Sequence, residues 1–329
     1  MNRRELPIKF EEVSEEEKAQ MKRPVGRNYG LVRGTPGNIL LPARYADLAS
    51  SIYNFEFRSD DIVVVTYPKT GTVWTAELLW ALTHLDQLHT LDTDHISLRN
   101  FFIDRDFIFP PSKDDPSPLV KAFLEKFPNG RVEDGVVLQL AKAETGRRII
   151  KTHLPLHFFN EDLLKKTKVV YVARNPKDTC VSYHFFLRQR QDQTVECDFP
   201  TMAEQFMTDK CNYSPFWGHI QPAWDLRDHP NLHFVFYEDM KADIVKELQK
   251  INDFLSLDLT VDQLTKVAEA TSFDNMRRRD QNQPLVKGTF FRKGIIGDWK
   301  NMATPELDAK MDRWIAENSK KLGITFRYA

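Results

Sequence analysis

A lysine and a glycine stand where a predicted strand meets a predicted helix. Residues 61–66 form a short β-branched run, typical of a strand buried on both faces, and the loop Tyr67-Pro68-Lys69-Thr70-Gly71 follows it. A helix is expected from Val73 to Leu85, because its residues are apolar nearly all round. The first N–H groups of such a helix are unpaired and its dipole is positive there, so the loop predicts an anion site to which Lys69 adds a full charge. An ordinary strand-to-helix turn with a solvated lysine is the alternative.

The order of residues in this loop separates it from the loop of nucleotide triphosphatases. That loop has the pattern G-x-x-x-x-G-K-[ST], with the lysine after the second glycine, whereas here Lys69 precedes Gly71. A second predicted strand, residues 168–173, ends at Arg174, where a kinase of the P-loop type is expected to have an acid for Mg²⁺. An arginine instead suits phosphate. The two loops therefore indicate a phosphate-type site of another kind.

A histidine follows a third predicted strand, residues 148–152. Imidazole titrates near neutral pH, so His153 is a candidate general base toward an acceptor hydroxyl. Lys151 lies two residues earlier, hence on the same side of an extended strand, and could face the same acceptor. Taken alone, one of nine histidines is more often a hydrogen-bonded structural residue, because a lone histidine carries no geometry.

These strands alternate with predicted helices, which predicts a parallel sheet with helical crossovers. A fourth strand is expected over residues 232–237, followed by a helix over residues 239–255, and a last helix from Thr304 ends at Gly323. We predict an α/β fold with a single domain, residues 1–329. Its central parallel sheet is flanked by helices, and its strand-loop-helix around Lys69 is P-loop-like.

Four segments lie outside this plan. Residues 1–22 are polar and acid-rich, which predicts a mobile N-terminal arm or a surface helix. Residues 24–42 are interrupted by proline and glycine and are expected to be irregular covering structure. Residues 100–135 combine phenylalanine with proline, and either a ligand-covering insertion or aromatic packing under a loop fits them. The triplet Arg277-Arg278-Arg279 is typical of a solvated face.

The composition of the chain restricts the classes of partner and the location that can be expected for it. The 329 residues include 46 Lys and Arg against 47 Asp and Glu, a net charge of −1, so no global basic field predicts binding to nucleic acid or to an anionic membrane. Three cysteines without a C-x-x-C pair predict reduced thiols rather than a zinc ribbon or a disulfide framework. No segment approaches about 18 uninterrupted apolar residues. A cytoplasmic protein is therefore expected.

Five motifs, in order along the chain, resemble those of the cytosolic sulfotransferases, which use 3′-phosphoadenosine 5′-phosphosulfate (PAPS). They are residues 66–72 with Trp74, similar to the 5′-phosphosulfate loop; residues 151–155, similar to the catalytic histidine segment; residues 171–178 with Ser182 and Tyr183, similar to the 3′-phosphate segment; residues 236–240 with 271–273, similar to the adenine-side segments; and residues 292–294 with 297–299, similar to the terminal signature. Any one motif is weak evidence, whereas five in the right order are specific.

The resemblance implies transfer of sulfonate from PAPS to the hydroxyl or amine of a small, largely apolar acceptor by in-line displacement. PAPS would be a co-substrate that leaves as adenosine 3′,5′-bisphosphate. No metal is implied, because a transferring sulfonate bears less charge than a phosphoryl group. Three catalytic residues are implied: Lys69 at the bridging oxygen, His153 as general base, and Lys151 facing the acceptor and the sulfonate.

The resemblance also implies a set of PAPS-binding residues, some at the 3′-phosphate and some around the adenine. The set is Lys69, Thr70, Gly71, Thr72, Val73, Trp74, Arg174, Ser182, Tyr237, Thr271, Ser272, Phe273, Met276, Phe290, Phe291, Arg292, Lys293 and Gly294. Without the resemblance, Arg292 and Lys293 are typical of a solvated charge pair, and the aromatic residues are typical of core packing.

The chain departs from the family pattern at two places. Val73 stands where the family usually has a second threonine, so one hydroxyl contact to the 5′-phosphate is absent. The dimer signature K-x-x-x-T-V-x-x-x-E is represented by Lys300, Thr304, Pro305 and Ala309, with its valine and glutamate replaced. A homodimer stays open, but the dimer mode of the family does not carry over.

Three other functions remain open on the sequence. The same fold could act as a dehydratase, because sulfonation of an allylic alcohol creates a good leaving group. A metal-dependent nucleotide kinase of related loop design is the second alternative, and a non-catalytic nucleotide-binding protein is the third.

Overall fold

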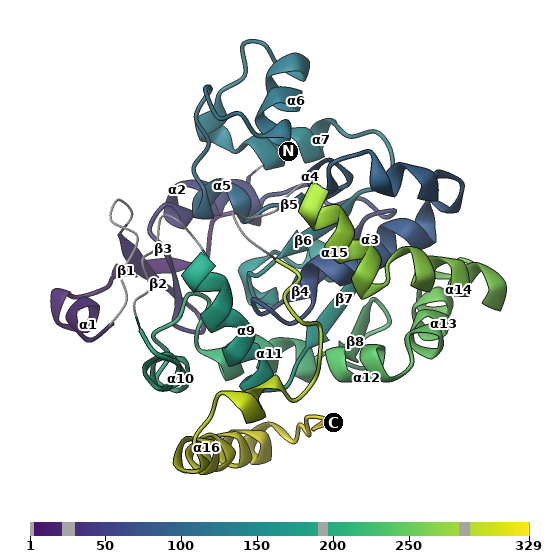
Figure 1. The fold of residues 1–329 in the computed structure, drawn as a ribbon. Coiled ribbons are helices and arrows are strands. Elements are labelled where there is room, and N and C mark those ends of the chain that lie inside the picture. Colours follow the sequence, from purple (N-terminus) through teal and green to yellow (C-terminus); the bar gives the residue numbers. More distant parts are fainter. Residues whose placement is uncertain (1–2, 22–29, 190–196, 283–289, 329) are drawn as a thin grey trace.

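The computed structural model describes residues 3–21, 30–189, 197–282 and 290–328. Its central sheet is parallel, with the strand order β5 (Asn100–Phe102), β6 (Ile149–Thr152), β4 (Ile62–Thr66), β7 (Lys168–Ala173) and β8 (Leu232–Phe236) (Figure 1). Every residue of β4 is buried, as its uninterrupted β-branched sequence predicts for a central parallel strand. The predicted α/β fold with a parallel sheet is confirmed, and β5 is an additional strand that the sequence analysis assigned to the insertion.

The register of the sheet places the candidate motifs at one edge. Val65 of β4 pairs with Thr152 of β6, and Thr66 pairs with Val172 of β7. Because the three strands are parallel, the segments that follow them leave at the same edge of the sheet. The loop after β4, His153 after β6 and Arg174 after β7 are thereby brought together.

Helices cover both faces of this sheet (Figure 1). They are α1 (Glu15–Gln20), α2 (Tyr45–Tyr53), α3 (Thr72–Thr83), α4 (Ile96–Arg99), α5 (Arg105–Ile108), α6 (Pro118–Lys126), α7 (Val136–Ala143), α8 (Asp162–Lys166), α9 (Pro176–Gln189), α10 (Phe199–Met207), α11 (Phe216–Asp225), α12 (Tyr237–Ala242), α13 (Ile244–Leu255), α14 (Val261–Ala270), α15 (Phe273–Asn282) and α16 (Pro305–Leu322). Short 3₁₀ turns are η1 (Leu85–Asp92), η2 (Val132–Asp134), η3 (Leu156–Phe158) and η4 (Asp298–Asn301).

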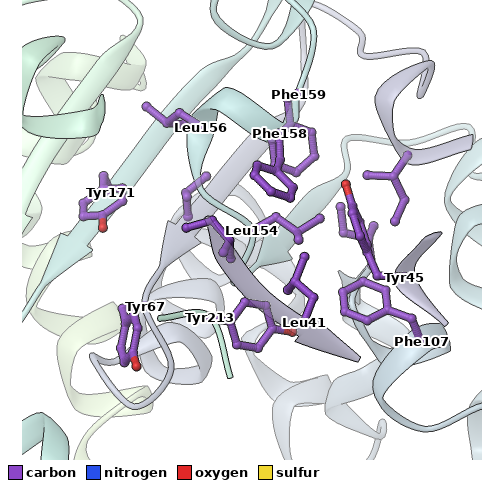
Figure 2. Packing of buried hydrophobic residues seen from close by; sticks show 14 of the residues in the cluster. Leu41, Tyr45, Tyr67, Phe107, Leu154, Leu156, Phe158, Phe159, Tyr171 and Tyr213 are labelled. Carbon is purple, nitrogen blue, oxygen red and sulfur yellow. The ribbon is translucent and has the colours of Figure 1, made fainter. Parts of the chain in front are cut away.

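The alternation of side chains along β4 divides the interior into two cores. Val63 and Val65 join the larger core, with residues of α2, α7, α9, α10, α11 and α16, whereas Ile62 and Val64 join the smaller one, with α3, α13 and α14. Figure 2 shows part of the larger core, where the rings of Tyr45 and Phe107 lie 5.2 Å apart. No helix in the described ranges is both long enough and apolar enough to cross a bilayer.

The N-terminal segment is ordered structure, which corrects the predictions of a mobile arm and of irregular cover, whereas α1 matches the predicted surface helix, since none of its residues is buried. Strand β1 (Lys9–Glu12) pairs antiparallel with β2 (Leu31–Thr35), which pairs with β3 (Ile39–Pro42). Ile8 and Val13, on either side of β1, are buried, so residues 3–21 are not a mobile arm. Residues 31–35 and 39–42 are likewise strands rather than irregular cover, because the apolar run in β3 packs into the core and pairing supplies its backbone hydrogen bonds. Residues 1–2 and 22–29 lie outside the described part.

The phenylalanine-rich segment, residues 100–135, contributes both to the core and to the lining of a cavity. Phe101 and Phe107 are buried in the core, whereas Phe102 and Phe109 line a cavity. The helix predicted over residues 239–255 is two helices, α12 and α13, because Asp243 has an extended φ of −153° and its side chain accepts from the Lys246 N–H. The last helix has its N-cap at Thr304 and ends at Gly323, as predicted.

Candidate active site

One cavity of about 700 Å³ lies at the carboxyl edge of the sheet and contains most of the candidate residues. At one end it is lined by the loop after β4, by Arg174, by Tyr237 and by residues 290–295. Elsewhere it is lined by residues 95–97, by Arg105, Ile108 and Phe109, by residues 115–119 and by the apolar side chains of Phe102 and Leu187. His153, Lys151 and Tyr213 belong to the same lining. A cationic region and an apolar region therefore share one cavity.

The loop between β4 and α3 adopts a conformation that depends on glycine. Lys69 has a φ of +71° and Gly71 a φ of +116°, and α3 begins at Thr72. A Cβ on Gly71 would lie 3.0 Å from the ring of Tyr237, so another residue would be strained there as well as crowded. The Thr70 hydroxyl donates to the carbonyls of Tyr67, at 2.8 Å, and Val172, at 3.0 Å. The Thr70 side chain thus fastens the loop to β7 and does not line the cavity.

The Lys69 ammonium lies between two aromatic rings. Its Nζ is 4.3 Å from the centroid of Phe186 and 3.9 Å from that of Phe290. Burial lowers the pKa of Lys69 to about 7, and the positive charges of Arg174 and Arg292 act in the same direction against Asp280. A cation held in this way is under-compensated, so a phosphate or sulfate anion in the cavity would stabilise its charged form.

His153 is oriented by the strand beside it. Its Nδ1 lies 3.0 Å from the carbonyl oxygen of Thr66, an atom that only accepts, so Nδ1 carries the proton and Nε2 holds the free lone pair. The ring packs edge-on against Phe102 and Tyr213, with centroids 5.1 and 5.4 Å away. Burial, with the charges of Lys69 and Lys151, lowers the pKa of His153 to about 3 against the effect of the Thr66 carbonyl. The imidazole is therefore neutral and able to accept a proton.

A buried carboxylate that sequence reasoning missed holds this histidine in place. Asp104 accepts from the Thr152 hydroxyl at 2.5 Å, from the His153 backbone N–H at 2.8 Å and from the Tyr213 hydroxyl at 2.8 Å. Burial raises the pKa of Asp104 to about 7, and the three hydrogen bonds oppose that rise. No local pattern indicates Asp104, because it lies 49 residues before His153 in a segment read only for its phenylalanines.

Lys151 is held by a second buried network. Its Nζ donates to Asn100 Oδ1, and Asn100 Nδ2 donates to Glu77 Oε1 at 2.9 Å. Glu77 also binds Arg99, at 2.8 Å, and is fully buried on α3. Burial lowers the pKa of Lys151 to about 8, with Glu77 opposing and Arg99 reinforcing the effect. Glu77 of α3 thus holds the Lys151 ammonium in the cavity wall through Asn100.

Arg174 joins the loop after β4 to the segment before η4. It donates to the carbonyls of Lys69, at 3.1 Å, and Ile295, at 3.3 Å, and its guanidinium lies 4.3 Å from the ring centroid of Tyr237. Its Nε is buried and has no hydrogen-bond partner among the residues that the structure describes. A buried donor of this kind costs about 1–3 kcal/mol.

Arg292 and Lys293 are not a freely solvated pair. Arg292 Nη2 lies 2.5 Å and Lys293 Nζ 2.7 Å from the carboxylate of Asp298, and Arg292 also covers the ring of Phe185. Burial acts to raise the pKa of Asp298, but hydrogen bonds from Lys293, Arg292 and Asn301 outweigh it and lower that pKa to about 2. Both cations line the cavity, held by one carboxylate.

Aromatic residues form the remaining wall near the loop. Trp74 and Tyr237 pack edge-on with centroids 5.7 Å apart, and the Trp74 indole N–H donates to the carbonyl of Thr271 at 3.0 Å. Gly294 has a φ of +65°, and a Cβ there would lie 2.3 Å from the Phe273 ring. A side chain at residue 294 would therefore displace the Phe273 wall.

The structure brings together all but three of the predicted site residues. Those that line the cavity are Lys69, Gly71, Thr72, Val73, Trp74, Lys151, His153, Arg174, Ser182, Tyr237, Phe273, Met276, Phe290, Phe291, Arg292, Lys293 and Gly294. Thr70, Thr271 and Ser272 are not among the lining residues. The Thr271 hydroxyl is fully buried and donates to the Val267 carbonyl at 2.7 Å, so it ends α14 instead of facing a ligand.

Comparison with known proteins assigns this arrangement. The family model described as "Sulfotransferase domain" matches residues 59–323. The chain belongs to the sulfotransferase family. This sulfotransferase is 32% identical over 307 residues to Sulfotransferase 1A1 of Canis lupus familiaris, covering 90% of this chain and 94% of that protein. It is 32% identical over 289 residues to Cytosolic sulfotransferase 5 of Arabidopsis thaliana, covering 83% and 84%.

Solved structures agree with the family assignment. A retinol dehydratase in complex with retinol and PAP superposes with a TM-score of 0.86 at 26% identity, covering 98% of this sulfotransferase and 99% of that chain. Mouse sulfotransferase SULT7A1 complexed with PAP gives a TM-score of 0.64 at 26% identity, with 86% and 92% covered. PAP is adenosine 3′,5′-bisphosphate, the product that PAPS leaves. This sulfotransferase is accordingly a transferase that moves sulfonate from PAPS to a small-molecule acceptor.

Proposed function

We propose that the chain, as a single domain over residues 1–329, transfers sulfonate to the hydroxyl of a small, largely apolar molecule with His153 as general base. The position of His153 carries the proposal, because it lies in the wall of one cavity that is cationic at one end and rich in apolar side chains at the other. A neutral imidazole with a free Nε2 lone pair at that position can take a proton from an acceptor.

The catalytic step divides between three side chains. PAPS, when bound, supplies the sulfonate. His153 accepts the proton of the acceptor hydroxyl as its oxygen bonds to sulfur. Lys69 donates to the bridging oxygen, which takes the electron pair of the breaking S–O bond and leaves with the bisphosphate. Lys151 is proposed to stabilise charge on the sulfonate from the adjacent wall, as a fixed donor in a site that excludes water.

The PAPS-binding residues are proposed from their position in the cationic end of the cavity. The N–H groups at the start of α3 and Lys69 would bind the 5′-phosphosulfate. Arg174, Ser182, Arg292 and Lys293 would bind the 3′-phosphate, and the Trp74 and Phe273 walls would enclose the adenine. The cations Arg174 and Arg292 in the cavity lining and the lowered pKa of Lys69 support an anionic occupant. Thr70 and Thr271 would contribute through their backbone only, because their hydroxyls are already bonded.

A substitution at His153 tests the base. Labelled PAPS with a panel of phenols, steroids and aliphatic alcohols should give sulfonated products with the wild type. His153→Ala should lower kcat by about 10²–10⁴-fold, the contribution typical of a general base. Its affinity for adenosine 3′,5′-bisphosphate should be unchanged, and His89→Ala, at an exposed position, should behave as wild type. Wild-type turnover by His153→Ala would contradict the assigned role.

Dehydration is a second candidate function, favoured by the similarity of the fold to that of a retinol dehydratase. At the same 26% identity, retinol dehydratase superposes with a TM-score of 0.86 and the mouse sulfotransferase with 0.64. Sulfonation of an allylic alcohol followed by loss of sulfate would give an alkene. Retinol incubated with PAPS and this enzyme separates the two functions, since a dehydratase releases free sulfate whereas a simple transferase leaves a stable sulfate ester.

We also propose a cytoplasmic location, which the name of the Arabidopsis relative supports. A small molecule is the proposed acceptor partner.

A further inference from the structure

The part of the cavity lining that residues 95–119 contribute is not uniformly apolar. Apolar side chains there, such as Ile108 and Phe109, share the wall with a polar group of five residues, which are His95, Ser97, Arg105, Asp115 and Ser117. They come from the N-terminal end of α4, the start of α5 and the segment that leads into α6, where α4 and α6 pack together. An acceptor that were only hydrocarbon would leave this polar wall without a partner.

Arg105 is the cation of this wall and is incompletely bonded. Its Nη2 donates to Asp115 Oδ2 at 3.3 Å and to Ser117 Oγ at 3.2 Å, both long contacts. Its Nη1 is buried and has no hydrogen-bond partner among the described residues. A guanidinium presents five N–H donors and the two long contacts engage Nη2 alone, so Arg105, which lines the cavity, retains donors for a ligand.

Asp115 does not cancel the donor character of the wall. It is the one carboxylate among the described residues that line the cavity, and its Oδ1 already accepts from the Ser117 backbone N–H at 2.9 Å. Burial acts to raise the pKa of Asp115, but the Ser117 contacts and Arg105 outweigh it, so the pKa is lowered and the carboxylate stays charged as the partner of Arg105. An anchored carboxylate of this kind orients the guanidinium.

His95 adds a second donor. Its Nδ1 accepts from the Ser97 backbone N–H at 3.2 Å, so the proton of the neutral ring lies on Nε2. Burial lowers the pKa of His95, and the charges of Arg99, Lys151 and Arg105 lower it further, which keeps the ring neutral and reports a positive field at this wall. Arg105 and His95 therefore both offer N–H groups, and a ligand oxygen that accepts hydrogen bonds would suit them.

We propose that the acceptor carries, opposite its reacting hydroxyl, a second oxygen group, a ketone or a carboxylate, which Arg105 binds with His95 beside it. This inference rests on the proposed function, since it names the acceptor class of the same site. Arg105 immediately follows Asp104, which holds His153, so one short segment positions both the base and this distal donor. His153 and Arg105, the two groups proposed to contact the acceptor, are therefore positioned by the same short segment.

A matched series of acceptors tests the proposal. One neighbouring structure is a retinol dehydratase in complex with androsterone, a steroid whose ketone lies at the end opposite its hydroxyl. Androsterone, the same steroid without the ketone, and the same steroid with a carboxylate in its place differ only at that end. In the wild type, kcat/KM for the ketone or the carboxylate should exceed that of the deoxy steroid by about 10–100-fold, mainly through KM.

Substitutions show which residue is responsible for the preference for a ketone or a carboxylate. Arg105→Met should abolish the difference between the three steroids by lowering kcat/KM for the ketone and the carboxylate to that of the deoxy steroid. Arg131→Met, at an arginine whose side chain is 73% exposed, should keep the wild-type preference. The melting temperature and the affinity for adenosine 3′,5′-bisphosphate of Arg105→Met report whether it is folded, and Arg105→Lys, which keeps the charge without the fork, should keep part of the preference.

The outcomes separate this inference from the proposed function. Equal kcat/KM for the three steroids in the wild type would overturn the inference and leave sulfonate transfer to apolar acceptors standing. A preference that survives in Arg105→Met would overturn the role of Arg105. Failure of all three steroids, and of the phenols and alcohols of the wider panel, would overturn the proposed function and the inference together.

Discussion

The charge of Lys69 should depend on whether an anion is bound. In the unliganded cavity, burial and the neighbouring arginines lower the pKa of Lys69 from 10.5 to about 7. A group with that pKa is about one-tenth protonated one pH unit higher and about one-hundredth protonated two units higher. A bound phosphate beside the ammonium favours the charged form, so it raises the pKa in the complex. Binding must then take up a proton wherever the free lysine is neutral and the bound lysine is charged.

The affinity for adenosine 3′,5′-bisphosphate should therefore fall as pH rises. Above about pH 7.5 the phosphates of the ligand, with a second pKa of about 6, are already ionised, so the lysine dominates. We expect Kd to increase by about tenfold per pH unit from there until the pKa of the bound lysine is reached. Calorimetry in buffers of different ionisation enthalpy measures both Kd and the proton uptake, which should rise toward one proton per ligand at about pH 9.

Two variants identify the group responsible. Lys69→Arg stays charged throughout this range, so its Kd should be nearly independent of pH and its proton uptake close to zero. Lys165→Arg makes the same exchange at a side chain that is 62% exposed and should retain the wild-type slope. A wild-type Kd that does not change with pH, or a Lys69→Arg profile with the wild-type slope, would refute the reasoning.

Three further predictions follow from single contacts. Gly294→Ala should raise the Kd for adenosine 3′,5′-bisphosphate at least about tenfold and lower the melting temperature. A left-handed φ costs an alanine about 1–2 kcal/mol, and the new Cβ would lie 2.3 Å from the Phe273 ring. Unchanged binding would be inconsistent with the proposed adenine wall. Asp104→Asn should lose about 1–3 kcal/mol of unfolding free energy and at least about tenfold in kcat while its affinity for PAPS is kept, because an amide cannot accept from all three donors. Steady-state kinetics and urea unfolding measure these changes. An unaltered kcat would show that Asp104 does not position the base. The wild type should lose stability as pH falls below 6.5, because the unfolded chain binds a proton that His153, with a folded pKa of about 3, does not. His153→Gln should reduce this slope by about 1.4 kcal/mol per pH unit between about pH 4 and about pH 6 in urea titrations, and an equal slope in both proteins would count against the lowered pKa.

Tertiary structure decided the N-terminal region against its local pattern. Residues 9–12 carry three charged or polar side chains and read as a solvated arm, yet they form β1 because β2 offers a partner strand. The buried Ile8 and Val13 on either side anchor the pairing. Hydrogen bonding between strands that are remote in the chain leaves no periodic signal in either one, which is why composition alone misjudged this segment.

The sequence by itself determined four of the five parallel strands, and most of the site residues predicted from its motifs line the cavity. The buried strands could be predicted because a strand covered on both faces must be apolar without interruption, and the motifs because each is a contiguous run beside a strand end. Only the folded chain decided which way each side chain points and what supports it. Thr70 and Thr271 turn their hydroxyls inward to carbonyls, and Asp104 reaches His153 across 49 residues. Buried polar groups must find partners wherever the fold brings them, and that requirement acts in space rather than along the sequence.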